Sequence, residues 1–117
     1  MIYFSPPDSN DSLTRLVLNG KEYVFHYSFN YHYGYWTMGI YEDYTTPIIT
    51  CIKVVPEFPL THYFKMVELP EGYIFVETTL ERIGRKDFAN ENARFVFVTY
   101  EELEAYAEAM GDERILG

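Results

Sequence analysis

The chain has 117 residues, a net charge of −9 and an aromatic content of 19%. A chain of this length forms one domain with its own hydrophobic core, and its apolar content of 48% excludes an intrinsically disordered protein. The acidic balance disfavours direct binding to nucleic acid or to an anionic membrane surface. The apolar runs are too short to span a bilayer, so we expect no membrane insertion.

The first twelve residues are expected to form an irregular N-terminal arm. Pro6-Pro7 and the Ser/Asn/Asp cluster that follows them disfavour regular structure. A first strand is predicted over Leu13–Leu18. The next two residues, Asn19-Gly20, accept the positive φ angles of a type I′ turn, so the chain is expected to return in a hairpin.

Strict alternation of side chains marks Glu22–Asn30 as the second strand of this hairpin. Tyr and Phe occupy every odd position from 23 to 29, while Val, His, Ser and Asn fill the even positions from 24 to 30. Period-two spacing places the aromatic rings on one face of a pleated strand. After a loop, Tyr35–Glu42 is predicted to be the third strand, with Trp36 anchoring the core and Met38 and Ile40 on the same face.

Ile48–Val55 is apolar at both parities except at Thr50 and Lys53. Such a run predicts a strand that is buried on both sides, or nearly so. The single cysteine of the chain, Cys51, lies in this run, so it cannot form an internal disulfide. It is predicted to be a buried structural thiol. The next segment, Leu60–Met66, is expected to be either a short helical turn or an irregular crossing segment.

Two more strands are predicted in the second half of the chain. A turn at Leu69-Pro70-Glu71-Gly72 leads into a strand over Tyr73–Thr78. Thr79–Asn92 is expected to be a loop, and Ala93–Val98 the last core strand.

At the C-terminal end, the spacing of the apolar residues changes from the two-residue period of a strand to that of an amphipathic helix. Thr99 and Glu102 are spaced as a capping box, and Gly111 is a natural stop. The apolar stripe falls at i, i+3, i+4 and i+7, on Leu103, Tyr106, Ala107 and Met110. The expected organisation is thus a single domain over residues 1–117, with an arm at 1–12, a β domain at 13–98 and a helix at 99–111. The expected fold class is mainly β, a small antiparallel β-barrel or sandwich with one C-terminal α-helix.

The sequence contains none of the common catalytic or metal-binding motifs. His26, His32 and His62 lack the spacing of zinc ligands, and neither a nucleophile elbow nor a phosphate-binding glycine loop is present. The acidic residues between Glu101 and Glu113 are typical of a solvated helix face. We therefore expect no catalytic residues, no metal site, no cofactor and no enzymatic activity.

Two segments are candidates for binding a partner. One is the aromatic loop with Tyr31, His32, Tyr33 and Tyr35, although tyrosines at hairpin ends also occur for packing alone. The other carries Arg82, Arg85 and Lys86, which are three of the nine basic residues and make the segment locally positive.

The order of landmarks resembles the small baseplate plug proteins of contractile-tailed bacteriophages. The landmarks are Leu18-Asn19-Gly20, Tyr23, Asn30, Trp36, Asp43, Pro47, Pro56, Leu60, Leu69-Pro70, Gly72, Asp87-Phe88 and Glu101-Glu102-Leu103. The resemblance covers roughly residues 13 to 110.

This resemblance implies a structural virion protein in the tail baseplate, synthesised in the cytoplasm of the host bacterium. It implies a plug that closes the distal end of the tail-tube lumen and docks to hub, tube and other baseplate proteins, without direct nucleic-acid binding. The main alternative from the residues is a small carbohydrate- or ligand-binding β module that uses the Tyr31–Tyr35 loop. A further rival is an enzyme of unknown type, which would require a cleft lined with titratable groups.

Overall fold

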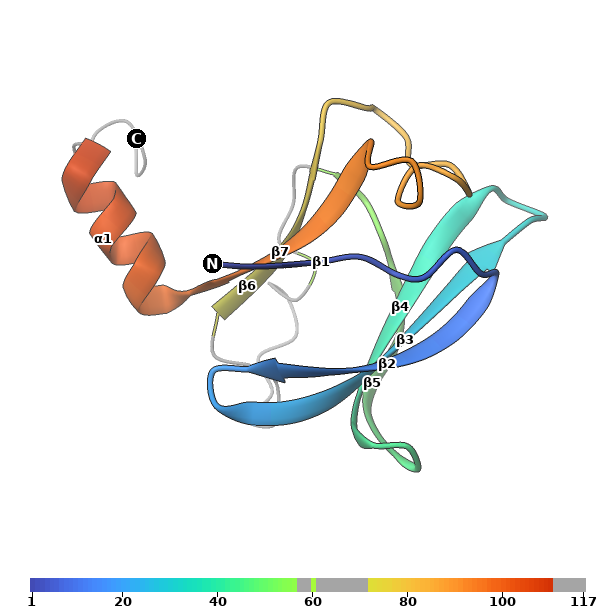
Figure 1. The fold of residues 1–117 in the computed structure, drawn as a ribbon, viewed down its shortest axis with the longest axis horizontal. Helices are drawn as coiled ribbons and strands as arrows, with labels where there is room; N and C mark the ends of the chain where they lie inside the picture. Colours follow the sequence, from blue (N-terminus) through green and yellow to red (C-terminus); the bar gives the residue numbers. More distant parts are fainter. Residues whose placement is uncertain (57–59, 61–71, 111–117) are drawn as a thin grey trace.

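Two antiparallel sheets lie face to face with the core between them (Figure 1). The computed structural model describes residues 1–56, residue 60 and residues 72–110, with side chains described as far as residue 105. The larger sheet has the order β2 (Asp11–Leu18), β3 (Lys21–Asn30), β4 (Tyr35–Asp43), β5 (Thr46–Lys53). The smaller sheet has the order β1 (Ile2–Phe4), β7 (Ala93–Thr99), β6 (Gly72–Thr78), and α1 (Tyr100–Met110) follows β7. The predicted class is confirmed in its sandwich form, because the two sheets do not close into a barrel over the described residues.

The core forms where the aromatic face of β3 meets the facing strand β7. Phe25 and Phe95 are fully buried, and Tyr27 is 1% exposed. The rings of Tyr27 and Phe95 stack with centroids 5.7 Å apart, and Phe88 stacks on the same Phe95 at 4.8 Å. The odd-numbered face of β3 therefore points inward as the alternation predicted, with Trp36, Met38 and Ile40 of β4 beside it.

The hairpin between β2 and β3 has the predicted turn. Asn19 has φ of 54° and Gly20 has φ of 81°, and two consecutive positive values are the mark of a type I′ turn. Leu18 and Lys21 are paired across it, and the ladder continues without a shift to Asp11 and Ser28.

The capping box at the start of α1 is also confirmed. The Glu102 amide donates to Thr99 Oγ1 at 3.1 Å, and the Thr99 amide donates to Glu102 Oε1 at 3.2 Å. Leu103 of the predicted apolar stripe is half-buried. The remaining stripe positions lie beyond the described side chains, and Gly111 lies outside the described residues.

The prediction of an irregular arm over residues 1–12 is wrong at both of its ends. Ile2–Phe4 forms β1 and pairs with β7, with Tyr3 opposite Val96. β2 begins at Asp11, two residues before the predicted strand. Pairing with an existing strand decides the conformation of β1, since local propensity alone does not require a strand there.

The predicted burial of the Ile48–Val55 segment is wrong as well. β5 spans Thr46–Lys53 at the edge of its sheet, and most of its residues are exposed or half-buried. Cys51 is exposed and has φ of 59°, so it is not a buried thiol. Ile52 nevertheless stays buried, and Ile48 and Ile49 pack against the core, so the exposure falls on Cys51 and the polar residues beside the irregular register between β4 and β5.

The predictions for residues 60–72 fall largely outside the described residues. Leu60 is buried, and its amide donates to the carbonyl of Ile74 at 2.7 Å. Gly72 is the first residue of β6, one residue before the predicted strand.

Candidate functional site

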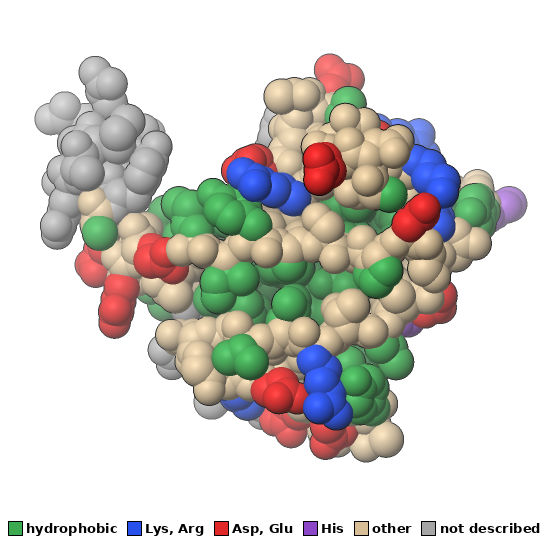
Figure 2. Space-filling model, viewed as in Figure 1, with side chains coloured by type: hydrophobic (Ala, Val, Ile, Leu, Met, Phe, Trp, Pro, Cys, Tyr) green, Lys and Arg blue, Asp and Glu red, His purple; other side chains and the backbone are tan. Residues whose placement is uncertain are grey.

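The two predicted binding segments meet at one corner of the sandwich, where the β3–β4 hairpin approaches the segment that follows β6 (Figure 1). We call this region the aromatic–basic corner and define it as residues 30–36 and 82–88 together with Asp8 and Asn10. Figure 2 shows basic side chains gathered at this end of the molecule, on the right of the view.

Asn30 fixes the start of the aromatic loop. Its Oδ1 atom accepts hydrogen bonds from the amides of His32 at 3.0 Å and Tyr33 at 3.1 Å, and its carbonyl accepts one from Gly34 at 2.7 Å. An asparagine side chain bonded to the next amides of its own chain stabilises a turn. Gly34 has φ of 72°, a left-handed conformation that favours glycine.

The ring-bearing side chains of this loop project into solvent. Tyr31 is 66% exposed and Tyr33 is 62% exposed. The rings of Tyr33 and Tyr35 stack with centroids 6.2 Å apart, and the ring of His32 contacts that of Tyr33 edge-on at 4.6 Å. The loop therefore presents several rings on a hydrogen-bonded backbone.

Arg82 joins the second segment to this loop. Its Nη2 atom donates to the carbonyl of Tyr33 at 2.6 Å and to that of Gly34 at 3.2 Å. A guanidinium that donates to two adjacent carbonyls holds the loop backbone in one position. The two segments that the sequence analysis proposed separately are thus parts of one structure.

Arg85 and Lys86 turn toward the N-terminal arm. Arg85 Nη1 lies 2.9 Å from Asp8 Oδ1 and Lys86 Nζ lies 3.0 Å from the same oxygen. Their hydrogen bonds, that of Lys86 first and then that of Arg85, hold the pKa of the Asp8 carboxyl below its ordinary value. Arg85 also stacks over the ring of Trp36 at 5.8 Å.

These contacts change how the two basic residues can act. The Arg85 side chain is only 17% exposed and serves mainly to position the arm, whereas Lys86 is 62% exposed. The sequence analysis missed Asp8 and Asn10 as members of the site. Asn10 Oδ1 accepts from Tyr31 Oη at 2.7 Å and from Arg85 Nε. A turn-rich arm gives no local signal for a contact with residues more than seventy positions away.

A shallow hollow of about 440 Å³ opens beside the aromatic loop. Tyr33, Tyr35, Lys53 and Arg82 are among its lining residues, and the Lys53 ammonium lies 4.7 Å from the centre of the Tyr35 ring. The hollow therefore combines aromatic surface with two cationic groups and the carboxylate of Glu81.

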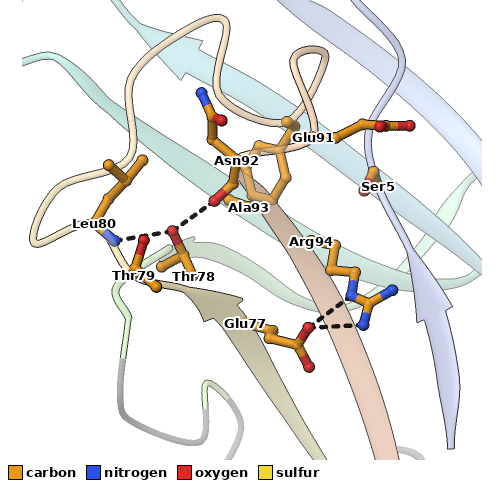
Figure 3. Close-up of a pocket in the computed structure, with 10 residues that line it drawn as sticks. Ser5, Glu77, Thr78, Thr79, Leu80, Glu91, Asn92, Ala93 and Arg94 are labelled. Carbon is orange, nitrogen blue, oxygen red and sulfur yellow. Dashed lines mark hydrogen bonds and ion pairs between the residues drawn. The ribbon is translucent and has the colours of Figure 1, made fainter.

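A larger hollow of about 720 Å³ lies between the ends of β6 and β7 and the segment around Asn92, with Phe88 of the corner among its lining residues (Figure 3). Its polar groups bond to one another. Arg94 Nη2 lies 2.7 Å from Glu77 Oε1. The Thr78 hydroxyl donates to the Asn92 carbonyl at 2.8 Å and accepts from the Leu80 amide at 3.1 Å. This arrangement braces the strand ends.

The histidines do not converge on a common site where the structure describes them. His26 Nε2 lies 2.6 Å from Asp11 Oδ1 on the outer face of the sheet, and His32 lies in the aromatic loop. His62 is outside the described residues. Over the described part of the chain, no group of three or more His, Cys, Asp or Glu side chains could hold a metal ion. No helix in those same residues is long and apolar enough to cross a membrane.

The fold and the corner define a small antiparallel β-sandwich protein with exposed aromatic rings on a hydrogen-bonded loop. A comparison with known families then identifies it more closely: residues 1–102 match the family described as cyanophage baseplate Pam3 plug gp18. The chain belongs to this family of phage baseplate plugs, which confirms the resemblance found in the sequence. No curated protein matched the chain.

Membership of this family makes the chain a structural protein of the phage tail baseplate, located in the virion and interacting with other baseplate proteins.

Proposed function

We propose that this protein closes the distal end of the tail-tube lumen and docks to hub and tube subunits through the aromatic–basic corner. The membership of a baseplate plug family carries the first part of the proposal. The exposed rings of Tyr31 and Tyr33 on a hydrogen-bonded loop support the second part. On this proposal the chain is made in the host cytoplasm, binds no nucleic acid directly and catalyses no reaction.

The geometry of the loop suits docking because little order must be gained on binding. Tyrosine supplies a large contact area with few rotatable bonds, so it is frequent at the centres of protein interfaces. The loop backbone is already held by Asn30 from within and by Arg82 from across the corner. Preorganisation of this kind reduces the entropic cost of association.

The net charge of −9 supports the expectation that the protein does not bind the genome. Its excess of negatively charged side chains repels the negatively charged phosphate groups of DNA, so a plug at the end of a DNA-carrying tube would not adhere to DNA in transit.

The docking part is tested by removing the exposed rings. Particles assembled with a Tyr31→Ala/Tyr33→Ala variant should contain about tenfold less of the protein, because loss of a tyrosine at a binding hot spot costs about 2 kcal/mol or more, which is about thirtyfold in affinity. Incorporation is measured by quantitative mass spectrometry of purified tails. The matched control is Tyr44→Ala, which removes a 50% exposed ring from the hairpin at the other end of the sheet. Normal incorporation of the double variant would contradict docking through this corner.

The closure part needs a separate measurement. Particles assembled without this protein should release DNA or admit small dyes through the tail before contraction, and particles with the wild-type chain should not. Tails that lack the protein and still remain sealed would refute the closure, whatever the docking result.

The carbohydrate-binding alternative has less support. Sugars stack on the open face of an aromatic ring, but Lys53 already lies over Tyr35, and Tyr33 and Tyr35 stack on each other. Isothermal titration of the isolated protein with a panel of glycans distinguishes the two functions, since only a lectin-like module would show saturable binding.

A further inference from the structure

The free edge of β2 differs from the other edge of the same sheet. Over the described residues, β2 pairs only with β3, and its eight residues contain no proline, no glycine and no register shift. β5 at the opposite edge carries Pro47, several register shifts and the positive φ of Cys51. Proteins use such irregularities to prevent unwanted strand pairing at an edge. β2 is regular and lacks them, so its edge is competent to accept another strand.

The register of the hairpin tells which residues face this edge. The Phe29 amide donates to the carbonyl of Asn10 at 2.8 Å, so the even-numbered residues of β2 direct their backbone groups to β3. The odd-numbered residues direct theirs to the free edge and place their side chains on the outer face. These are Asp11, Leu13, Arg15 and Val17. Leu13 is 50% exposed and Val17 is 59% exposed.

We propose that the β2 edge pairs antiparallel with β2 of a second copy of this chain, about a twofold axis at Leu13. Only the odd-numbered residues direct backbone groups to the edge, so an antiparallel ladder between two copies must place odd-numbered residues opposite odd-numbered residues. An axis at Leu13 places Asp11 of each copy opposite Arg15 of the other, and Leu13 opposite itself. An axis at Arg15 would oppose two like charges, and an axis at Thr14 would leave each charge opposite an aliphatic side chain. Charge complementarity therefore selects the register centred on Leu13.

Both charged side chains are held on the outer face in the single copy. The Asp11 carboxylate is 67% exposed and contacts His26 of β3 at 2.6 Å. The Arg15 guanidinium is 59% exposed and contacts Glu22 of β3 at 3.3 Å. Both partners lie on the β3 side, as does Tyr44, whose hydroxyl accepts from Arg15 Nε at 3.0 Å. Among the described residues, the edge at Asp11 is contacted by the Ser9 hydroxyl, which donates to the Asp11 carbonyl at 3.0 Å and which a second copy would displace. No residue of β2 lines either hollow, although Asn10 of the aromatic–basic corner directly precedes Asp11.

Sedimentation equilibrium of the wild-type protein tests the pairing. The interface is small, so we expect a monomer–dimer equilibrium with a Kd between about 10 μM and 1 mM, measured at roughly 0.15 M salt to screen the net charge. A protein that stays monomeric over this whole range would overturn the proposal. If such a monomer instead bound a strand from a baseplate protein, the edge would belong to a different partner.

Charge reversal tests the register. Asp11→Arg alone and Arg15→Asp alone each place like charges opposite one another twice, so each should weaken dimerisation by about tenfold or more. A mixture of the two variants restores opposite charges at both positions and should form heterodimers with a Kd within about threefold of the wild type. Single variants that dimerise like the wild type, or a mixture that remains monomeric, would each overturn the proposed register.

Two further variants separate the edge from general effects. Glu42→Arg makes the same change in net charge as Asp11→Arg, but on β4, away from the edge, and should leave the Kd unchanged. Leu13→Pro removes an amide that faces the free edge and none that bonds to β3, so it should abolish dimerisation while the circular dichroism spectrum stays that of the folded monomer. An equal loss of dimer in Glu42→Arg, or a folded Leu13→Pro variant that still dimerises, would count against pairing through β2.

Discussion

The core between the sheets and the aromatic–basic corner are stabilised by different interactions. Phe95, at the centre of the core, contacts Phe4, Tyr27 and Phe88 by ring stacking and is fully excluded from water. The corner is joined by hydrogen bonds and ion pairs on partly exposed residues, of which the Arg82 contacts are an example. Apolar burial is insensitive to pH and contributes most of the folding energy, whereas exposed polar contacts contribute little energy but fix geometry. The difference suits a docking protein, whose body must be stable and whose binding loop must be positioned.

The largest effect should follow from a substitution in the core. Phe95→Ala removes a fully buried ring and leaves a cavity, so the free energy of unfolding should fall by about 3–5 kcal/mol. Urea denaturation followed by circular dichroism measures this loss. Phe95→Leu, which keeps most of the apolar volume, serves as the comparison and should lose much less stability. Equal losses in the two variants would show that the ring stacking around Phe95 dominates over cavity formation.

A smaller effect is expected at the corner, from Gly34→Ala. A Cβ atom at Gly34 would lie 2.7 Å from Arg82 Nη2, and φ is 72°. The variant should lose about 1–2 kcal/mol from backbone strain alone, and in addition it should displace Arg82 from the loop.

Gly20→Ala provides a matched control for this prediction. Gly20 has φ of 81°, and a Cβ atom added there would meet no other atom within 4 Å, so the control carries the strain without the displacement. The difference between the two losses, measured by the same denaturation experiment, reports the Arg82 contact. A Gly34→Ala variant no less stable than Gly20→Ala would indicate that Arg82 adds nothing to the stability of the corner.

The contrast between core and corner also explains which features the sequence could predict. The aromatic face of β3, the Asn19-Gly20 turn and the Thr99–Glu102 capping box are local patterns, and each was predicted correctly from neighbours in sequence. Predictions from local patterns fail where pairing with a segment distant in sequence decides the structure. Ile48–Val55 is apolar enough for a central strand, but its position at the sheet edge depends on which strands pair.

The site was predicted in pieces for the same reason. The exposed tyrosines and the basic residues were identified from composition, because rings in a loop and clustered cations are visible in the sequence. Their assembly through Arg82 could not be predicted, nor could the role of Asp8, since both depend on contacts between segments far apart in the chain. β1 was missed because only its pairing with β7 makes it a strand.

The smallest predicted effect is a dependence of the corner's contacts on pH. The packing of the core should not depend on pH. Lys86 and Arg85 hold the pKa of Asp8 below its ordinary value of 3.8. For a carboxyl with a lowered pKa in the folded state, the stabilisation is complete above that ordinary value and is lost as the pH falls through the folded value. Contacts between the arm and the corner should therefore persist at neutral pH and weaken only below about pH 4.

An NMR titration of the Asp8 carboxyl carbon checks this directly. In the wild type the Asp8 pKa should lie below 3.8, and Lys86→Ala should raise it more than Arg85→Ala, because the hydrogen bond from Lys86 is the larger cause. Lys21→Ala, which removes a cation on the β2–β3 hairpin, should leave it unchanged. The Phe95 environment should not change over the same pH range, since no ionisable contact holds that ring in the described core. An Asp8 that titrates normally would mean that the arm is held by Asn10 and by β1 pairing, and that charge has no part in orienting the corner.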